Sequence, residues 1–100
     1  MKQFDVYRLK QSRGDGLVVI LQHDTTENLE TRIVAPLAQR SAIPPAERLR
    51  PIIEMDASEH VLVVDRIAAV ERRSLGQRVG SVAAHRDEII SALDLLFTGY

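Results

Sequence analysis

The sequence predicts one β-rich α+β domain, in which a small barrel or strongly bent sheet is closed by a C-terminal helix. Three observations predict this fold class. Short runs rich in β-branched residues follow one another over the first two thirds of the chain. Turn-forming residues separate these runs at short intervals. In the last third, the spacing of the apolar residues changes to that of a helix.

The first half of the chain predicts three strands. Residues 3–9 (QFDVYRL) mix apolar and polar residues in near alternation, as a half-buried strand does. Glycines in the segment 14–16 favour a reversal, and LVVIL at 17–21 is too short for an ordinary helix, so we expect a hairpin here. A third strand is predicted at 31–37. Pro36 cannot donate to a sheet ladder and predicts a strand end or a sheet edge.

The middle of the chain predicts a second hairpin. The segments 51–55 and 60–64 are rich in apolar residues and flank a turn-forming stretch at 56–59. A short strand is expected at 67–70. Ahead of this hairpin, a pair of prolines favours one helical turn at 46–49, because proline is tolerated at a helix start.

The last third predicts an amphipathic helix with defined ends. Its apolar residues recur at helical spacing: Ile89, Ile90, Ala92, Leu93, Leu96 and Phe97. Its polar face is formed mostly by Arg86, Asp87, Glu88, Ser91 and Asp94. Ser81 is a candidate cap for the helix start. Gly99 stands where a helix commonly ends in a left-handed residue.

Composition restricts the function classes. The 100 residues form a single predicted domain, 1–100, with 13 basic and 14 acidic side chains and a formal net charge of -1. This balance supplies no overall attraction to nucleic acid or to an anionic membrane. The absence of cysteine excludes disulfides and thiolate metal sites. Because the sequence has neither a signal-peptide pattern nor a long apolar run, we expect a cytoplasmic protein without a membrane anchor.

No spacing of residues supports catalysis or a metal site. The three histidines are far apart in the sequence, so we interpret them as surface or loop residues: His23, His60 and His85. The Arg-Gly-Asp tripeptide at 13–15 is interpreted as a turn. A basic cluster is interrupted by acidic residues and lacks aromatic residues, which favours a solvated surface over an RNA site; it comprises Arg66, Arg72, Arg73 and Arg78. We therefore expect no cofactor.

The end of the sequence, LLFTGY at 95–100, admits two interpretations. In the first, Phe97 fills the core, Gly99 caps the helix and Tyr100 packs on the surface. In the second, an exposed aromatic residue on a helix-anchored tail inserts into a partner with little ordering entropy to lose. The sequence pattern alone leaves both open.

Several stretches, in order, resemble the CcdB family, the toxins of plasmid and chromosomal toxin–antitoxin modules. They are QFDVY at 3–7, LQHD at 21–24, RIVAPL at 32–37, RPIIEMD at 50–56 and HRDEIISALDLLFTGY at 85–100. The resemblance covers almost the whole chain. It implies an SH3-like β barrel of the CcdB/Kid type with a small additional sheet and a C-terminal α-helix, assembled as a two-fold homodimer.

The resemblance implies a toxin that is not an enzyme. Such a toxin binds the A subunit of DNA gyrase and stabilises the covalent gyrase–DNA cleavage complex, without a cofactor and without sequence-specific contact to nucleic acid. A CcdA-like antitoxin neutralises it through a disordered segment that folds on binding. Arg32, in the polar set of its strand, is a candidate partner for an antitoxin carboxylate.

By resemblance, the gyrase-binding residues are Thr98, Gly99, Tyr100, Asp94, His23, Thr25 and Thr26. The best-known family pattern ends in Trp-Gly-Ile, so Thr98 replaces a large ring, and Thr25 and Thr26 stand where that pattern is aliphatic. Either Tyr100 takes over part of the aromatic contact, or poisoning is lost. For His23 and Asp94 a merely solvated position is the alternative interpretation.

Two further functions therefore remain open. The first is a silenced or retargeted relative that binds an antitoxin but does not poison gyrase. The second is an endoribonuclease, because related SH3-like barrels of the MazF and Kid type cleave RNA. An endoribonuclease would need a basic groove and a positioned acid and base, which the sequence pattern does not indicate.

Overall fold

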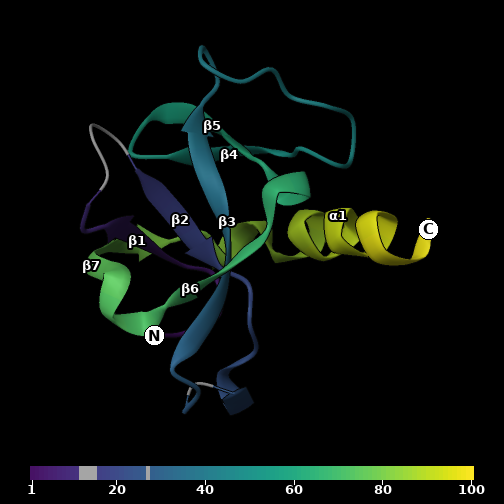
Figure 1. Cartoon of the computed structure of the whole chain (residues 1–100). Coiled ribbons are helices and arrows are strands. Elements are labelled where there is room, and N and C mark those ends of the chain that lie inside the picture. Colours follow the sequence, from purple (N-terminus) through teal and green to yellow (C-terminus); the bar gives the residue numbers. More distant parts are fainter. Residues whose placement is uncertain (12–15, 27) are drawn as a thin grey trace.

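The fold is a curled antiparallel sheet with one helix at the end of the chain (Figure 1). The computed structural model describes residues 1–11, 16–26 and 28–100, so the turn predicted at Gly14 and Asp15 lies outside the described residues. The elements are β1 (Asp5–Leu9), β2 (Leu17–Ile20), β3 (Thr31–Gln39), β4 (Ile52–Met55), β5 (Ser58–Leu62), β6 (Ala68–Glu71), β7 (Leu75–Ser81) and α1 (Arg86–Thr98). The strand order is β4-β5-β3-β2-β1-β7, and β6 pairs with β3. The predicted β-rich α+β class is confirmed.

Strand β2 is buried on both faces, which explains why its sequence shows no polar alternation. One face belongs to the main core, which also contains Ile89 and Ala92 of α1. The other face belongs to a smaller cluster, in which Val18 and Ile20 pack with Val34 of β3. The sheet therefore separates a helix-covered core from a second apolar layer.

Strand β3 is the central strand, and it is longer than predicted. One edge pairs with β2; along the other edge, residues 31–34 pair with β6 and residues 37–39 pair with β5. Pro36 lies at the changeover, where its carbonyl accepts from Val63 N at 2.9 Å. The N–H that proline lacks would face this junction between two partner strands. The prediction that Pro36 ends the strand or marks an edge is therefore wrong.

The second hairpin is confirmed, with a tighter turn than predicted. Met55 pairs with Ser58, so the turn consists of Asp56 and Ala57, whose φ angles are 53° and 62°. Positive φ at both positions is what a type I′ turn requires, and that turn matches the twist of paired strands. Because β5 also pairs with β3, the small additional sheet is continuous with the barrel strands.

The helical turn predicted at 46–49 is wrong. The backbone instead forms a tight loop, in which Leu49 N donates to the Glu47 carbonyl at 2.7 Å around Arg48. Arg48 has a φ of 63°, which a right-handed helical turn does not contain. The side chain of Arg48 reaches α1, where its Nε donates to Ser91 Oγ at 2.7 Å.

A bidentate ion pair holds the end of this loop. Arg50 donates to both carboxylate oxygens of Asp65, at 2.8 and 2.7 Å. Asp65 belongs to the short helix η2 (Val64–Arg66), which packs against α1. The hydrogen bond from Arg50 lowers the pKa of the Asp65 carboxyl and raises the pKa of the Arg50 guanidinium.

Strand β7 was not predicted. It contains two glycines and few apolar residues, so it shows little of the pattern that indicates a strand. A Cβ at Gly76 would lie 3.0 Å from the Arg8 carbonyl oxygen of β1, so the strands approach closely there. Arg78 donates to the buried Asp5 at 3.2 Å, and this bond raises the pKa of Arg78.

Helix α1 begins later than Ser81. Ser81 Oγ accepts from Ala83 N at 3.2 Å, at the start of the short helix η4 (Ala83–His85), which separates Ser81 from α1. At the other end, Gly99 has a φ of 80° and its N donates to the Leu95 carbonyl at 3.1 Å. The prediction that Gly99 ends the helix in a left-handed conformation is confirmed.

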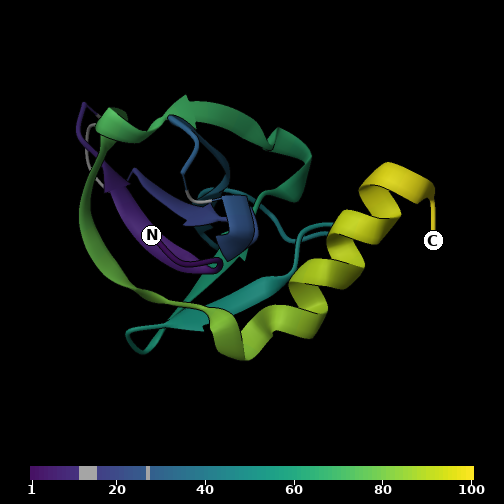
Figure 2. The same ribbon diagram turned by 90° about the horizontal axis from the view of Figure 1, so that it is seen from below.

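The outer turns of α1 project beyond the sheet, as Figure 2 shows from below. Ile89 and Ala92, near the start of the helix, are fully buried, whereas Phe97 is 67% exposed. The expectation that Phe97 belongs to the buried apolar face is therefore wrong. Phe97 follows the helical period, but no strand lies beneath the last turn to cover it.

Candidate functional site

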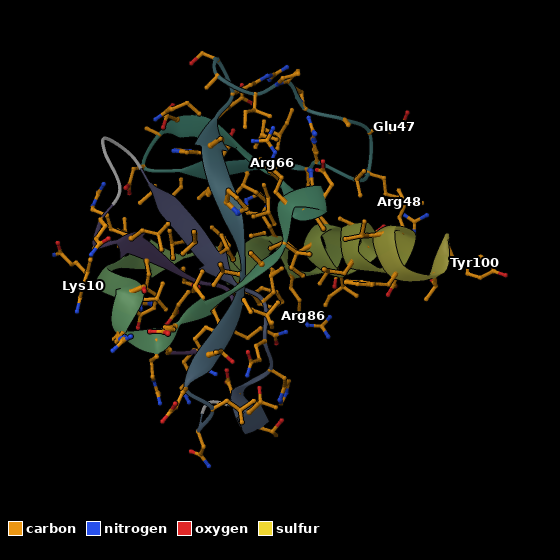
Figure 3. The ribbon with its side chains drawn as sticks, in the orientation of Figure 1. Lys10, Glu47, Arg48, Arg66, Arg86 and Tyr100 are labelled. Atoms are coloured by element: carbon orange, nitrogen blue, oxygen red, sulfur yellow. The ribbon has the colours of Figure 1, made fainter. Side chains whose placement is uncertain are left out.

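The tail at the end of α1 is exposed throughout. Residues 98–100 are all exposed, and Tyr100 retains 83% of its accessible surface. Figure 3 shows Tyr100 extending beyond the last turn of α1, away from the sheet. The left-handed Gly99 sets the direction in which the tail leaves the helix. This geometry agrees with the interpretation of the tail as a recognition element and not with its packing on the barrel.

Asp94 lies one helical turn before Thr98 on the exposed side of α1. Its backbone carbonyl accepts from Thr98 Oγ1 at 2.7 Å. Within the part of the chain that the structure describes, the Asp94 carboxylate makes no hydrogen bond or ion pair. Asp94, Thr98, Gly99 and Tyr100 therefore form one continuous exposed set, which we call the tail surface.

His23, Thr25 and Thr26 form a second set, on the loop that follows β2. This loop contains the short helix η1 (Asp24–Thr26). Thr25 N donates to His23 Nδ1 at 3.1 Å, and Thr26 Oγ1 donates to the His23 carbonyl at 2.7 Å. His23 thus stabilises the helical turn much as a capping residue does. We call these residues the η1 surface.

The tail surface and the η1 surface lie apart within one chain. In Figures 1 and 2, η1, drawn in blue, is well separated from the C-terminal end of α1. The structure therefore brings the predicted gyrase-binding residues together as two groups and not as one. The sequence pattern gives no information on this separation.

Arg32 is not available to an antitoxin carboxylate on the surface. Its side chain is 1% exposed, and it donates to the Thr26 carbonyl through Nη1 at 3.0 Å and to the Met1 carbonyl through Nη2 at 3.3 Å. The expectation of a surface ion pair is wrong, because Arg32 shares a strand face with the buried Val34. Its hydrogen bond to Thr26 of the η1 surface is a structural feature that the sequence pattern did not indicate.

The histidines occupy three different environments. His23 is exposed, and His85 has its Nδ1 at 3.2 Å from Glu88 Oε2. His60, however, is buried in β5, so its interpretation as a surface residue is wrong. No group of histidine, aspartate or glutamate residues in the described ranges is arranged to hold a metal ion. Across those same residues, no helix has the length and apolar character needed to cross a bilayer.

Two solved structures share this fold over nearly the whole chain. A solved structure of an endoribonuclease in complex with its cognate antitoxin, from Mycobacterial species, has a TM-score of 0.77 and 17% identity, over 94% of this chain and 91% of that chain. An endoribonuclease from Mycobacterial species has a TM-score of 0.77 and 16% identity, over 94% of this chain and 88% of that chain. At these identities the similarity shows the fold alone.

The chain belongs to the CcdB family. The family model described as CcdB protein matches residues 3–99, nearly the whole chain. The resemblance inferred from the sequence stretches is thereby confirmed. No curated protein matches the sequence.

Proposed function

We propose that this protein is the toxin of a toxin–antitoxin module, which binds the A subunit of DNA gyrase and stabilises the gyrase–DNA cleavage complex. The observation that carries the proposal is the tail surface: an exposed aromatic residue held by a helix that projects from the sheet. A tail anchored in this way loses little conformational entropy when a partner covers it. Membership of the CcdB family supports gyrase as that partner.

The threonines at the two surfaces are compatible with a buried contact. Thr98 Oγ1 donates to the Asp94 carbonyl and Thr26 Oγ1 to the His23 carbonyl, both at 2.7 Å, and Thr25 Oγ1 lies 3.1 Å from His23 Nδ1. A hydroxyl that already has an internal partner loses little when a protein covers it. This argument favours a working toxin over the silenced relative.

Aromatic contact area is present without tryptophan. Phe97 and Tyr100 are both more than half exposed and both lie at the projecting end of α1. Aromatic side chains contribute strongly at the centres of protein interfaces. Together they offer gyrase an aromatic surface of different geometry from the Trp-Gly-Ile pattern.

A homodimer explains how the two separated surfaces serve one partner. Two copies related by a two-fold axis present two tails and two η1 surfaces to the symmetric A-subunit dimer of gyrase. The partly buried Leu93 and Leu96 leave apolar surface on the outer half of α1 for the contact between the two copies. Light scattering during gel filtration measures the mass, and a monomer at micromolar concentration would contradict this part of the proposal.

The remaining features of the proposal follow from the family. The protein has no reaction of its own, acts in the cytoplasm and is neutralised by a CcdA-like antitoxin. The solved complex of an endoribonuclease with its cognate antitoxin supports antitoxin binding by this fold.

A cleavage assay separates the candidate functions. Purified protein is incubated with gyrase and supercoiled plasmid, and detergent and protease are then added. Linear DNA is the expected product, because detergent traps the stabilised cleavage complex. Cleaved RNA in a parallel reaction, without linear DNA, would establish the endoribonuclease alternative, which at present has only the shared fold in its favour. Neither product would indicate the silenced relative.

Asp94 offers a residue-level test with a matched control. Asp94→Asn removes one exposed charge from the tail surface, and Glu54→Gln removes one from an exposed position in β4. If the Asp94 carboxylate pairs with a cation of gyrase, Asp94→Asn should raise the half-maximal protein concentration for DNA cleavage by roughly tenfold, about 1.4 kcal/mol. Glu54→Gln should match the wild type. Equal activities of both variants would show that the Asp94 carboxylate does not contact gyrase.

A further inference from the structure

Arg32 is a buried cation without an anionic partner. It is the largest fully buried side chain of the described residues, at 1% exposure. None of the ion pairs in the described part of the chain includes it, and its Nε has no hydrogen-bond partner. Burying a charge costs free energy unless hydrogen bonds compensate for it. Such a residue is a poor choice for stability alone.

The bonds that Arg32 does make join three segments of the chain. From β3, its guanidinium donates to the Thr26 carbonyl at 3.0 Å, at the end of η1. It also donates to the Met1 carbonyl at 3.3 Å, in the N-terminal segment. Hydrogen bonds from a charged donor are stronger than neutral ones. Arg32 therefore links the η1 loop and the N-terminal segment to the central strand.

Other polar side chains reinforce the same loop. Gln22 Nε2 donates to the Thr26 carbonyl at 3.0 Å, while Gln22 Oε1 accepts from Ile33 N at 3.0 Å. Asp24 Oδ1 accepts from Gln3 N at 2.7 Å. The Thr26 carbonyl is thus the acceptor on which the side chains of Gln22 and Arg32 converge.

We propose that Arg32 is a positioning residue, which holds the η1 loop in one conformation so that His23, Thr25 and Thr26 are presented to a partner as a preformed surface. An apolar side chain would suit the position better for stability, because its strand face is shared with Val34. The charged residue instead orders the loop and lowers the entropic cost of binding. The gain in binding rests on the proposed function, whereas the ordering of the loop does not.

The test compares Arg32→Met with Arg32→Lys. Methionine removes the charge but keeps an unbranched chain, so the melting temperature should be unchanged or higher. Amide hydrogen exchange at Thr26 and Leu29, whose N–H groups are bonded within the loop, should accelerate by roughly tenfold. Exchange at Leu62, whose N–H is bonded to the Pro51 carbonyl and not within the η1 loop, should not change. Lysine should restore part of the protection, because it keeps the charge and one donor group.

A control separates loss of stability from loss of loop order. Ile20→Val removes one methyl group from the apolar cluster on the same face of the sheet, so it should lower the melting temperature without accelerating exchange in the η1 loop. Arg32→Met should accelerate exchange in the η1 loop without lowering the melting temperature. This opposite pair of responses is not expected if Arg32 merely stabilises the fold.

The functional readout is the gyrase cleavage assay. Arg32→Met should raise the half-maximal protein concentration by roughly tenfold, and it should add little further loss in a variant that already carries Thr25→Ala and Thr26→Ala. A wild-type protein that does not poison gyrase would contradict the proposed function and leave the exchange experiment as the test of Arg32. Arg32→Met with lower stability and wild-type loop exchange would overturn the proposal. Should Arg32→Met not fold, Arg32→Lys with wild-type exchange and lower stability would overturn it in the same way.

Discussion

The inner and outer halves of α1 share one helical period but have opposite environments. In the inner half, Ile89 and Ala92 are fully buried against the sheet. In the outer half, Phe97 is largely exposed, and the tail beyond it is exposed throughout. The helix therefore continues past the sheet that stabilises it. An apolar residue in helical register contributes to stability only where another element lies beneath it.

Because of this difference, the two halves of the helix serve different purposes. The inner half closes the main core and fixes the direction of α1. In the outer half, Leu93 and Leu96 still pack against the main core, whereas Phe97 and the tail beyond it are exposed and are therefore free to serve recognition. The separation of a rigid base from an exposed end is what a docking element requires.

The largest effect on stability is expected for the inner half. Ile89→Ala should lower the free energy of unfolding by about 2–5 kcal/mol, because it leaves a cavity in a fully buried position. Phe97→Ala removes a larger side chain, yet it should change the same free energy by no more than about 0.5 kcal/mol. Urea denaturation at equal protein concentration measures both. Similar losses in the free energy of unfolding would show that the two halves of α1 contribute equally to stability.

A smaller effect is expected where the outer half meets the tail. Gly99→Ala places a Cβ at a φ of 80°, where no heavy atom lies within 4 Å, so any cost comes from the backbone and not from a clash. That cost should be about 1 kcal/mol, expressed as fraying of the last turn. Reduced gyrase cleavage should accompany it, because Tyr100 loses its fixed direction. A variant as stable and as active as the wild type would show that the left-handed cap is not needed.

The smallest effect concerns the ion pair between Arg50 and Asp65, which holds the end of the loop at 46–50. The hydrogen bond from Arg50 lowers the folded-state pKa of Asp65 below its unfolded value of 3.8, so the pair stabilises the fold above that pH and the contribution is lost as the pH falls below it. Asp65→Asn should therefore lower the melting temperature by a few degrees at most at pH 7. The difference from the wild type should shrink as the pH falls below 3.8 and through the lowered folded-state pKa of Asp65. A difference that grows on acidification would contradict this assignment.

Much of the fold could be predicted because local patterns determine it. The helical spacing of the apolar residues and the position of Gly99 predicted α1 and its end. Strand β7 could not be predicted, because its glycines allow close approach to β1 and leave few apolar side chains to show a pattern. Pro36 was misinterpreted because the change of partner strand beside it is a property of the assembled sheet.

The site was predicted less completely than the fold. The resemblance selected residues of both surfaces, but it could not show that the η1 surface and the tail lie apart. Nothing local distinguishes Arg32 from an exposed arginine on a half-polar strand. Its burial depends on the N-terminal segment and the η1 loop, which are separated from it in the sequence and meet only in the folded chain.

The central claim is that the projecting end of α1 recognises gyrase without stabilising the fold. Its most direct measurement is the comparison of the full chain with a truncated chain that lacks residues 98–100, in urea denaturation and in the gyrase cleavage assay. We expect the free energy of unfolding to change by no more than about 1 kcal/mol, the cost also expected for disturbing the Gly99 cap, and the half-maximal concentration for cleavage to rise at least about 100-fold, equivalent to roughly 2.7 kcal/mol. A truncated protein that yields linear DNA at the wild-type concentration would contradict the account.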